Sequence, residues 1–369
     1  MSWSTVRADQ FCTLITDGTH DSPKPQQSGW KLITSKHLKG HYIDFDSANW
    51  ISEADYLKVI SRSAVEQWDI LFSMIGTIGN IYLEKNPHVE YACKNMGIFK
   101  FSGNKENALW MYYYLKSPQA KAYIQTHLRG STQAYVPLGG LREMPVPVPP
   151  QSVRNEIIAV LRPIDEKIEC NNAINDNLQQ QAQAIYSSMF IDNPDPAWSH
   201  GHLSDLITVK YGKDHKKLAD GIYPVYGSGG IMRYVERPLY NKESVLIPRK
   251  GTLNNVMYVN QPFWSVDTMF YTEMKLPNVA KFVYHFVKAK DLASMNAGSA
   301  VPSMTTDILN AMEVVIPSAS ALEEFESLVA PMYEAMEAND VQSKALSQMR
   351  DTLLPKLMSG EIDVSDIQL

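Results

Sequence analysis

The sequence repeats itself, and this internal repeat limits the possible folds more than any other feature. The residues Leu141, Met144 and Val146 recur as Leu309, Met312 and Val314, each 168 positions later. The same offset holds as far as the pair Leu178 and Leu346. Further upstream the offset becomes 175, and there segment 69–77 parallels segment 244–252. A fixed offset over such a span indicates two related units, and its change predicts loops of different length inside them.

Each repeat ends in a long stretch with a seven-residue periodicity. Apolar residues alternate there at spacings of four and three, which is the pattern of a coiled coil. The predicted helix–helix interface consists of Ile157, Leu161, Ile164, Ile168 and Leu178 in the first stretch and of Phe325, Val329, Met332, Met336, Leu346 and Leu353 in the second. Polar residues interrupt both seams at matching places, Asn171 and Asn175 in the first and Asn339 and Ser343 in the second. A buried polar layer costs stability but fixes the register of paired helices.

Capping residues predict where the two helices begin, and prolines predict where they are distorted. Ser320 and Glu323 have the spacing of a capping box, and Ser152 takes the corresponding place before the first helix. Pro163 and Pro331 should each kink or interrupt a helix in its first third. About 38 residues at ~1.5 Å per residue predict a rod of roughly 57 Å. Two unrelated amphipathic surface helices are the alternative, but the shared offset and the matched polar layer favour pairing with each other.

The stretches before the helices have the mixed pattern of an α+β fold. Short apolar segments between turn residues predict strands, and longer segments predict helices. The expected strands are 69–75, 97–101, 244–247 and 256–259, and the expected helices are 104–115 and 279–288. The chain therefore divides into a first globular domain (1–149), a first long helix (150–190), a linker with a second globular domain (191–316), and a second long helix with a tail (317–369).

The net charge of −6 hides an uneven distribution of charge along the chain. Residues 1–149 contain 15 Lys and Arg against 13 Asp and Glu, and residues 198–316 contain 13 against 10. Residues 150–197 contain 3 against 7, and residues 317–369 contain 3 against 10. Both globular stretches are thus mildly basic, and both helical stretches are acidic. We expect a polyanion to meet the globular parts, whereas the acidic parts face a partner or solvent.

Other sequence features argue against several classes of protein. No run of eighteen apolar residues predicts a membrane span, and residues 1–10 lack the pattern of a signal peptide. The three cysteines, Cys12, Cys93 and Cys170, are an odd number and far apart, which favours a reducing cytoplasm over a disulfide framework or a metal site. The phosphate-binding motif GxxxxGK[ST] and a strand followed by GxGxxG are both missing. We therefore expect no cofactor and no catalysis by this chain.

One short segment superficially suggests an enzyme. Residues 192–196 (DNPDP) resemble the Asn/Asp-Pro-Pro-aromatic loop of adenine methyltransferases. The aromatic residue is missing, and no cofactor-binding glycine motif precedes the segment. Because it follows the first long helix, a proline-rich linker is the simpler interpretation.

Over essentially its whole length the chain resembles the specificity subunit of type I restriction–modification systems. The similar segments are 145–150 (PVPVPP) and 358–362 (MSGEI) at the helix ends, 17–23 and 31–35 in the first domain, and 211–213, 223–228 and 249–252 in the second. Gly229 and the pair Leu253 and Asn254 depart from the residues usual in the family at these positions. These departures concern the geometry of the loops.

The resemblance implies an architecture and a set of partners. Such subunits have two tandem target-recognition domains, each followed by a long helix, and the two helices pair as an antiparallel coiled coil. They bind double-stranded DNA at an interrupted, asymmetric target and act in phage defence. The resemblance implies two DNA adenine methyltransferase subunits that carry S-adenosylmethionine, and ATP-dependent restriction subunits. None of that chemistry belongs to this chain.

Candidate DNA contacts in the first domain lie in two segments. Loop 17–23 contains Asp17, Thr19 and His20, whose polar groups could bond to base edges or phosphates. An ordinary Asp-Gly turn with local capping is the alternative. Lys36 belongs to a short basic cluster, which is equally typical of a solvated face.

Candidate DNA contacts in the second domain are more basic. They are Lys213 and Lys216 in one cluster, Tyr226, Ser228 and Arg233 in a glycine-rich stretch, and Arg249, Lys250 and Thr252 after an apolar segment. Arginine can bond bidentately to guanine, and lysine can neutralise phosphate. A flexible hairpin and solvated charges are the alternatives. The first domain has Met74 and Ile75 where the second has Arg249 and Lys250, so the two domains should read different chemistry.

Two functions remain. The sequence favours a DNA-recognition subunit whose helices act as a spacer between two readers. The alternative is a duplicated, non-catalytic protein-binding scaffold with a coiled-coil stalk, which the acidic total charge favours and the basic globular domains disfavour.

Overall fold

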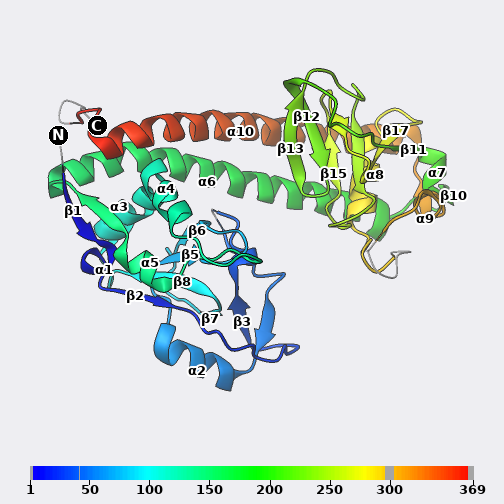
Figure 1. Cartoon of the computed structure of the whole chain (residues 1–369). Helices are drawn as coiled ribbons and strands as arrows, with labels where there is room; N and C mark the ends of the chain where they lie inside the picture. Colours follow the sequence, from blue (N-terminus) through cyan, green and yellow to red (C-terminus); the bar gives the residue numbers. More distant parts are fainter. Residues whose placement is uncertain (1–2, 41, 296–302, 365–369) are drawn as a thin grey trace. The chain divides into compact units, whose positions relative to one another are not determined.

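The chain forms two compact units, and each unit contains parts of both long helices (Figure 1). The computed structural model describes residues 3–40, 42–295 and 303–364. The first unit comprises Met1–Asn171 and Val341–Leu369, and the second comprises Asn172–Asp340. A unit is therefore one globular part together with a segment of each long helix.

The first unit contains three sheets. The largest has the order β2 (Leu14–Asp17), β8 (Met96–Lys100), β5 (Ile70–Ser73) and β6 (Ile81–Leu83), with all neighbours antiparallel. A second sheet has the order β4 (Asn49–Ile51), β3 (Trp30–Ile33) and β7 (Tyr91–Cys93), in which β3 and β7 are parallel. The third pairs β1 (Ser4–Arg7) with β9 (Pro145–Val148). Because β9 directly precedes the first long helix, this pair ties the start of the unit to the start of that helix.

Short helices cover the sheets of the first unit, and their ends follow capping rules. They are α1 (Ala8–Phe11), the 3-10 turn η1 (Ser35–His37), α2 (Glu53–Ser63), α3 (Lys105–Lys116), α4 (Pro118–Thr126) and α5 (Leu138–Glu143). Side chains of Ser52, Asn104 and Ser117 accept hydrogen bonds from the first turns of α2, α3 and α4. The apolar face of α3 lies in the core with Ile70, Phe72 and Phe99 of the large sheet.

The second unit has the same sheets in the same order. Its large sheet has the order β11 (Ile207–Tyr211), β17 (Met269–Met274), β14 (Ser244–Pro248) and β15 (Met257–Val259). The middle sheet has the order β13 (Gly230–Val235), β12 (Asp220–Gly227) and β16 (Trp264–Ser265). The last sheet pairs β10 (Ser199–His202) with β18 (Glu313–Ile316). Its helices are α7 (Leu203–Leu206), α8 (Ala280–Lys288) and α9 (Thr306–Asn310). As in the first unit, the middle sheet contains one parallel pair, β12 with β16.

The structure confirms the duplication seen in the sequence. β9 and β18 lie 168 positions apart, and so do the first residues of α5 and α9. The predicted strands and helices of both globular parts are present, each within two residues of its expected ends. Helices α2 and α4 have no counterpart in the described part of the second unit. The first unit is therefore the same scaffold with α2 inserted, and the positions that correspond to α4 at the offset of 175 lie largely outside the described residues.

The two long helices are α6 (Gln151–Ser187), which continues into a π-helical turn at Ser188–Asp192, and α10 (Ala319–Ser359). They pair antiparallel in both units. In the first unit Asn171 donates to Gln342 (2.9 Å) and Ser343 (3.1 Å). In the second unit the amide of Asn175 donates to Asp340 (2.8 Å), and Tyr186 packs edge-on against Phe325. The matched polar residues of the sequence thus lie in the helix–helix seam, as predicted.

Every residue of the predicted helix interface is buried or half-buried. The buried ones also pack into the globular cores: Ile157 and Leu161 in the first unit, and Phe325 and Val329 in the second. Each helix is thus part of a coiled coil and part of a domain core. Within the described residues, no helix is long and apolar enough to cross a membrane.

Three predictions about the helices were wrong. Helix α6 begins at Gln151, so Ser152 lies inside the helix and does not precede it. Helix α10 begins two residues earlier than the predicted capping box, and Ser318, not Ser320, caps it by accepting from the amide of Ala321 (3.3 Å). The helices also continue without a break through Pro163 and Pro331. A proline removes one backbone donor and its ring crowds the carbonyl four residues earlier, but the apolar seams on both sides of each proline hold the helix in place.

Polar contacts fix the helices to each globular part, and their chemistry differs between the units. In the first unit Asp165 of α6 bonds to Lys116 (3.1 Å) and Arg350 (2.7 Å). Burial alone would raise the pKa of Asp165, but the two cations outweigh it and hold that pKa below its usual value. In the second unit Tyr333 occupies the position 168 residues later and bonds to His285 (2.9 Å). Burial lowers the pKa of His285 to about 4, so this contact is neutral.

Candidate nucleic-acid interface

In both units, loops gather at one edge of the large sheet. Strands β2 and β5 are both antiparallel to β8, so their carboxyl ends lie at the same edge of the sheet. Strands β11 and β14 have the same relation to β17. The loops at this edge are 17–22, 35–38 and 74–80 in the first unit and 211–217, 227–229 and 249–255 in the second; we call each set the loop edge. Most candidate residues of the sequence analysis lie in these loops.

The first loop of each edge is held by the same backbone hydrogen bonds. They join the amides of Gly18 and Thr19 to the carbonyls of Met96 (2.9 Å) and Cys93 (2.9 Å), and the amides of Gly212 and Lys213 to those of Met269 (3.0 Å) and Ser265 (2.8 Å). A Cβ on Gly18 would lie 2.3 Å from a carbonyl oxygen, and one on Gly212 would lie 2.0 Å from another. Only glycine fits such a close approach. Thr19 and Lys213 therefore occupy equivalent positions with different side chains.

The second and third loops of each edge also correspond. Asn80 and Asn255, which are 175 positions apart, donate their side-chain amides to the second loop, at Leu38 (3.3 Å) and Ser228 (2.9 Å) respectively. Gly76 and Gly251 have φ angles of +80° and +85°, a conformation that favours glycine. The strand registers also make Met74 equivalent to Arg249. The backbone of the edge is thus shared, and its side chains are not.

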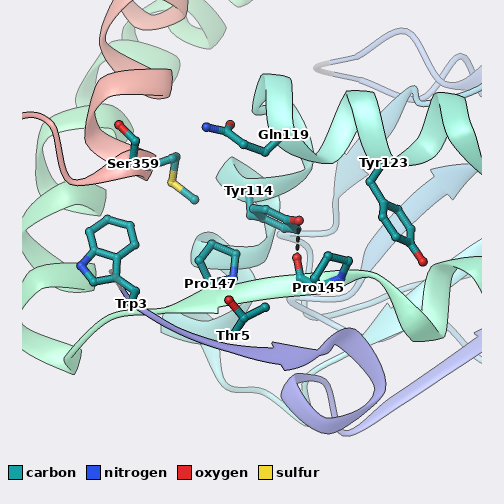
Figure 2. A pocket seen from close by; sticks show the side chains of 9 residues that line it. Trp3, Thr5, Tyr114, Gln119, Tyr123, Pro145, Pro147 and Ser359 are labelled. Carbon is teal, nitrogen blue, oxygen red and sulfur yellow. Dashed lines mark hydrogen bonds between the residues drawn. The ribbon is translucent and has the colours of Figure 1, made fainter. Parts of the chain in front are cut away.

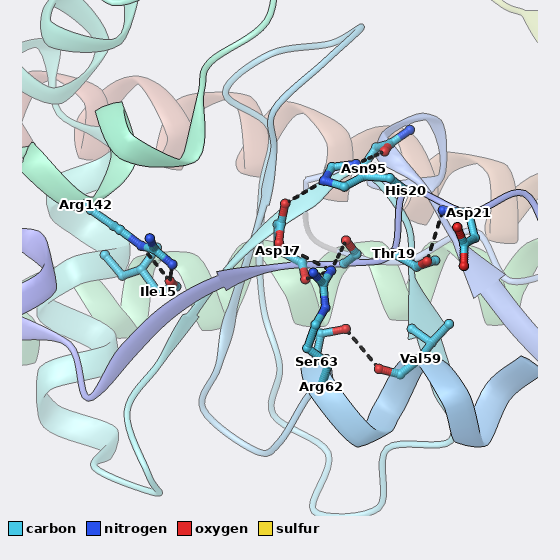
Figure 3. A network of polar contacts seen from close by, with 11 residues as sticks. Ile15, Asp17, Thr19, His20, Asp21, Val59, Arg62, Ser63, Asn95 and Arg142 are labelled. Atoms are coloured by element: carbon cyan, nitrogen blue, oxygen red, sulfur yellow. Dashed lines mark hydrogen bonds and ion pairs between the residues drawn. The ribbon is translucent and has the colours of Figure 1, made fainter.

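A polar network orders the loop edge of the first unit (Figure 3). The imidazole of His20 bonds through Nε2 to the Asp17 carboxylate and through Nδ1 to Asn95, both at 2.8 Å. Arg62 of α2 donates to the carbonyls of Asp17 (3.1 Å) and Gly18 (2.9 Å). The Asp17 side chain is only 13% exposed, whereas that of His20 is 67% exposed. Asp17 therefore holds His20, and His20 presents its ring to the outside.

The remaining candidates of the first unit, Thr19 and Lys36, differ in whether their polar groups already bond within the protein. The hydroxyl of Thr19 accepts from the amide of Asp21 (3.1 Å), and Asp21 bonds to Lys58 of α2 (2.9 Å). Lys36 is exposed on η1. The loop is therefore anchored by Arg62 and Lys58 of α2.

The loop edge of the second unit presents an arginine. Arg249 donates from Nη1 to the carbonyl of Asp267 (3.0 Å), and its guanidinium lies 5.5 Å from the centre of the Tyr211 ring. Lys250 and Thr252, in the same loop, are exposed. The arginine is therefore held at two points, and within the described part of the chain no contact engages its Nε or Nη2.

Other candidates of the second unit fall into two groups. Lys213 and Lys216 are exposed, and Ser228 is half-buried in the second loop. Tyr226, by contrast, is 8% exposed and lies in the core, where its hydroxyl accepts from Gln261 (3.3 Å). Arg233 bonds to Asp220 (2.6 Å) and to the carbonyl of Leu218. The first group faces the loop edge, whereas the polar groups of Tyr226 and Arg233 already bond to other groups of the protein, Tyr226 in the core and Arg233 with exposed Asp220 at the surface.

The comparison with protein families decides the relationship of the chain. The model of the type I restriction modification DNA specificity domain matches residues 3–180 and 197–325, well over half of the sequence. The chain belongs to this family. Each matched segment contains one complete loop edge, so the resemblance noted in the sequence is confirmed in both halves.

Relatives of this specificity family extend along nearly the whole chain. The specificity subunit of the type I restriction enzyme MjaIX of Methanocaldococcus jannaschii is 24% identical and covers 91% of this chain and 87% of its own length. The HindI specificity subunit of Haemophilus influenzae is 20% identical, over 85% and 90%. A crystal structure of the type I restriction–modification S subunit from M. genitalium has a TM-score of 0.56 at 17% identity, covering 97% and 96%. That structure has the same fold.

The sequence analysis missed several residues that support the loop edges. Arg62 and Asn95 reach the 17–22 loop from segments more than 40 residues away, and no local pattern indicates them. Tyr211 was noted only within a motif, although it supports Arg249. Asn80 and Asn255 could have been found, because they obey the 175-residue offset.

A pocket lies elsewhere in the first unit (Figure 2). It has a volume of about 420 Å³ and is lined by Trp3, Thr5, Tyr114, Gln119, Tyr123, Pro145, Pro147, Met358 and Ser359. Tyr114 donates a hydrogen bond to the carbonyl of Pro145 across its floor. None of these residues belongs to the loop edge. In residues 3–40, 42–295 and 303–364, no three His, Cys, Asp or Glu side chains lie together as a metal site.

Proposed function

We propose that the chain is the DNA-reading subunit of a type I restriction–modification complex and that each unit docks on one half of an interrupted, asymmetric target. One observation carries the proposal: the two loop edges have the same backbone and different side chains, with exposed Lys213 in place of Thr19 and Arg249 in place of buried Met74. A shared backbone presents both edges to the same kind of ligand. Different side chains then select different base sequences.

The second unit offers the clearer chemistry. Arg249 can donate from Nε and Nη2 to O6 and N7 of a guanine, because Asp267 and Tyr211 hold it by its other side. Exposed Lys213, Lys216 and Lys250 can neutralise phosphates. Thr252 and Ser228 supply hydroxyls at the same edge. Arg249 would thus specify a base, and the lysines would position the domain.

The first unit offers different groups. His20 is fixed by Asp17 and Asn95 through both ring nitrogens, so its exposed ring can pack against a base or sugar without losing further rotamer freedom. Thr19 lies beside it, and Lys36 is exposed on η1. Since Met74 replaces arginine here, the first half-site should differ from the second at the corresponding base.

The proposal also assigns roles to the helices and to partner proteins. Both α6 and α10 include residues of both units, so their length would set the gap between the half-sites. The chain would be non-catalytic and would position two DNA adenine methyltransferase subunits and ATP-dependent restriction subunits. The relatives named as specificity subunits of type I restriction enzymes support this assignment.

Binding measured against salt separates this function from that of a protein-binding scaffold. Fluorescence anisotropy of the full chain on labelled duplex DNA at several salt concentrations gives the slope of log affinity against log salt. A reader that contacts several phosphates loses affinity steeply, with a slope of about −0.9 per phosphate. No measurable binding, or a slope near zero, would favour the scaffold.

A further inference from the structure

We infer that the hairpin of β12 and β13 enters the major groove of the second half-site and that Met232 contacts the 5-methyl group of a thymine there. This inference rests on the proposed function and adds a specificity-determining residue. Met232 is 61% exposed and Ile231 is 49% exposed, both on β13. Two large apolar side chains exposed together on a short ribbon indicate a contact surface.

The position of Met232 connects it to the loop edge. A Cβ on Gly227 would lie 2.6 Å from the Met232 sulfur and 3.8 Å from Val266, so Met232 lies over Gly227 next to Val266. The residue after Val266 is Asp267, whose carbonyl holds Arg249. Met232 and the arginine therefore flank the same short segment.

The tip of the hairpin also lies next to the loop that contains Arg249. The carbonyl of Ser228 accepts from Asn255 (2.9 Å), and a Cβ on Gly251 would lie 2.6 Å from the Ser228 hydroxyl. The tip therefore packs directly against the loop that contains Arg249. A ligand that meets Arg249 also meets the exposed side of the hairpin.

Charge and shape favour DNA as the occupant over an apolar protein surface. Exposed Lys213, Lys216, Lys217 and Lys250 lie in the loops next to the hairpin, and with Arg249 they outnumber the exposed carboxylates there, which are Asp214, Glu236 and Asp267; Asp220 is paired with Arg233. An apolar protein partner would have to bury these cations, whereas DNA phosphates pair with them. The major groove admits a two-stranded ribbon, and thymine is the base that presents a methyl group there. The flexible thioether of methionine adapts well to such a contact.

The first unit does not share this feature. Strand β4 occupies the place of β13 in the order of the sheet, and its exposed apolar side chain is Trp50, whose ring lies 3.9 Å from the ammonium group of Lys31. The thymine contact is therefore assigned to the second half-site alone.

Replacing thymine by uracil tests the contact, because uracil lacks only the 5-methyl group. The duplex carries the target found by methylome sequencing, and each thymine of the second half-site is replaced singly. For the wild-type chain, one replacement should weaken binding about fourfold, the value of one buried methyl group. Met232→Ala should bind the thymine and uracil duplexes equally. Ile222→Ala is the matched control: Ile222 is 77% exposed at the other end of the hairpin, and this variant should keep the difference.

The outcomes separate the inference from the proposed function. If the wild-type chain binds the target and a scrambled duplex alike, the proposed function fails. If it binds the target specifically but no uracil replacement has an effect, or if Met232→Ala keeps the effect, only the inference fails. A second half-site without thymine in either strand also contradicts it. Unchanged thermal unfolding of Met232→Ala shows that the variant is folded.

Discussion

The guanidinium of Arg249 lies 5.5 Å from the ring centre of Tyr211, at a position that Met74 occupies in the first unit. The two loop edges therefore differ most where a base reader would act. If each unit reads one half-site, as we propose, the two half-sites should differ at the base that faces this position.

Loss of Arg249 should relax specificity in one half-site. We expect Arg249→Ala to cost about 1–3 kcal/mol on the specific duplex and to remove the preference at one base pair of the second half-site. Lys216→Ala should instead weaken all sequences alike and flatten the salt slope by about one unit. Anisotropy on specific and random duplexes distinguishes the two effects. Equal weakening of both duplexes by Arg249→Ala would make Arg249 a phosphate contact.

Lengthening the paired helices should change the gap in the target. An insertion of four residues within 171–178, about one helical turn, should alter the accepted spacing between half-sites and leave the bases of each half unchanged. Selection from a library of duplexes with variable gaps measures both properties. A changed base preference at an unchanged gap would contradict the role of the helices as a spacer.

Removal of the Asp165 carboxylate should destabilise the first unit. Asp165→Ala leaves Lys116 and Arg350 without their shared partner in a mostly buried site, and we expect a loss of about 3 kcal/mol. Glu166→Ala, which breaks an exposed pair with Arg162, should cost less than about 1 kcal/mol. Because the pKa of Asp165 is lowered in the folded state, its contribution is present above the ordinary carboxyl pKa and is lost as the pH falls through its lowered value. Unfolding by urea across this range should show a flatter acid dependence for the variant.

The second unit should be sensitive to acid in a different range. The pKa of His285 is about 4 in the folded chain, against about 6.5 when unfolded. The unfolded state therefore binds the proton more readily, and stability falls as the pH drops from about 6.5 to 4. The loss should approach about 3 kcal/mol. Urea unfolding of His285→Gln between about pH 6.5 and pH 4 should lack this loss of stability. If the variant loses as much stability as the wild-type chain, other groups cause the loss.

The sequence predicted well whatever depends on periodicity. The 168-residue offset recurs in the structure between β9 and β18, Asn171 bonds across the two long helices, and the residues of the predicted seam are buried or half-buried. The loop edges were predicted in outline, since Asp17, Arg249 and their neighbours lie in turn-rich segments after strands.

Contacts between distant segments could not be predicted. Arg62 lies in an inserted helix, and its bonds to the carbonyls of Asp17 and Gly18 depend on how that helix packs. Tyr226 was a candidate because it lies in a glycine-rich stretch, but its side chain fills the core under the middle sheet. The start of α10 at Ala319 was missed for a local reason, because Ser318 and Ser320 could each cap the helix.

Methylome sequencing of cells with and without this chain tests the central claim most directly, since it reports the modified base and both half-sites together. The account predicts an interrupted, asymmetric motif that is modified only when the chain is present, with a second half that changes at one base in Arg249→Ala. A continuous or symmetric motif, or the same modification in cells that lack the chain, would contradict the account.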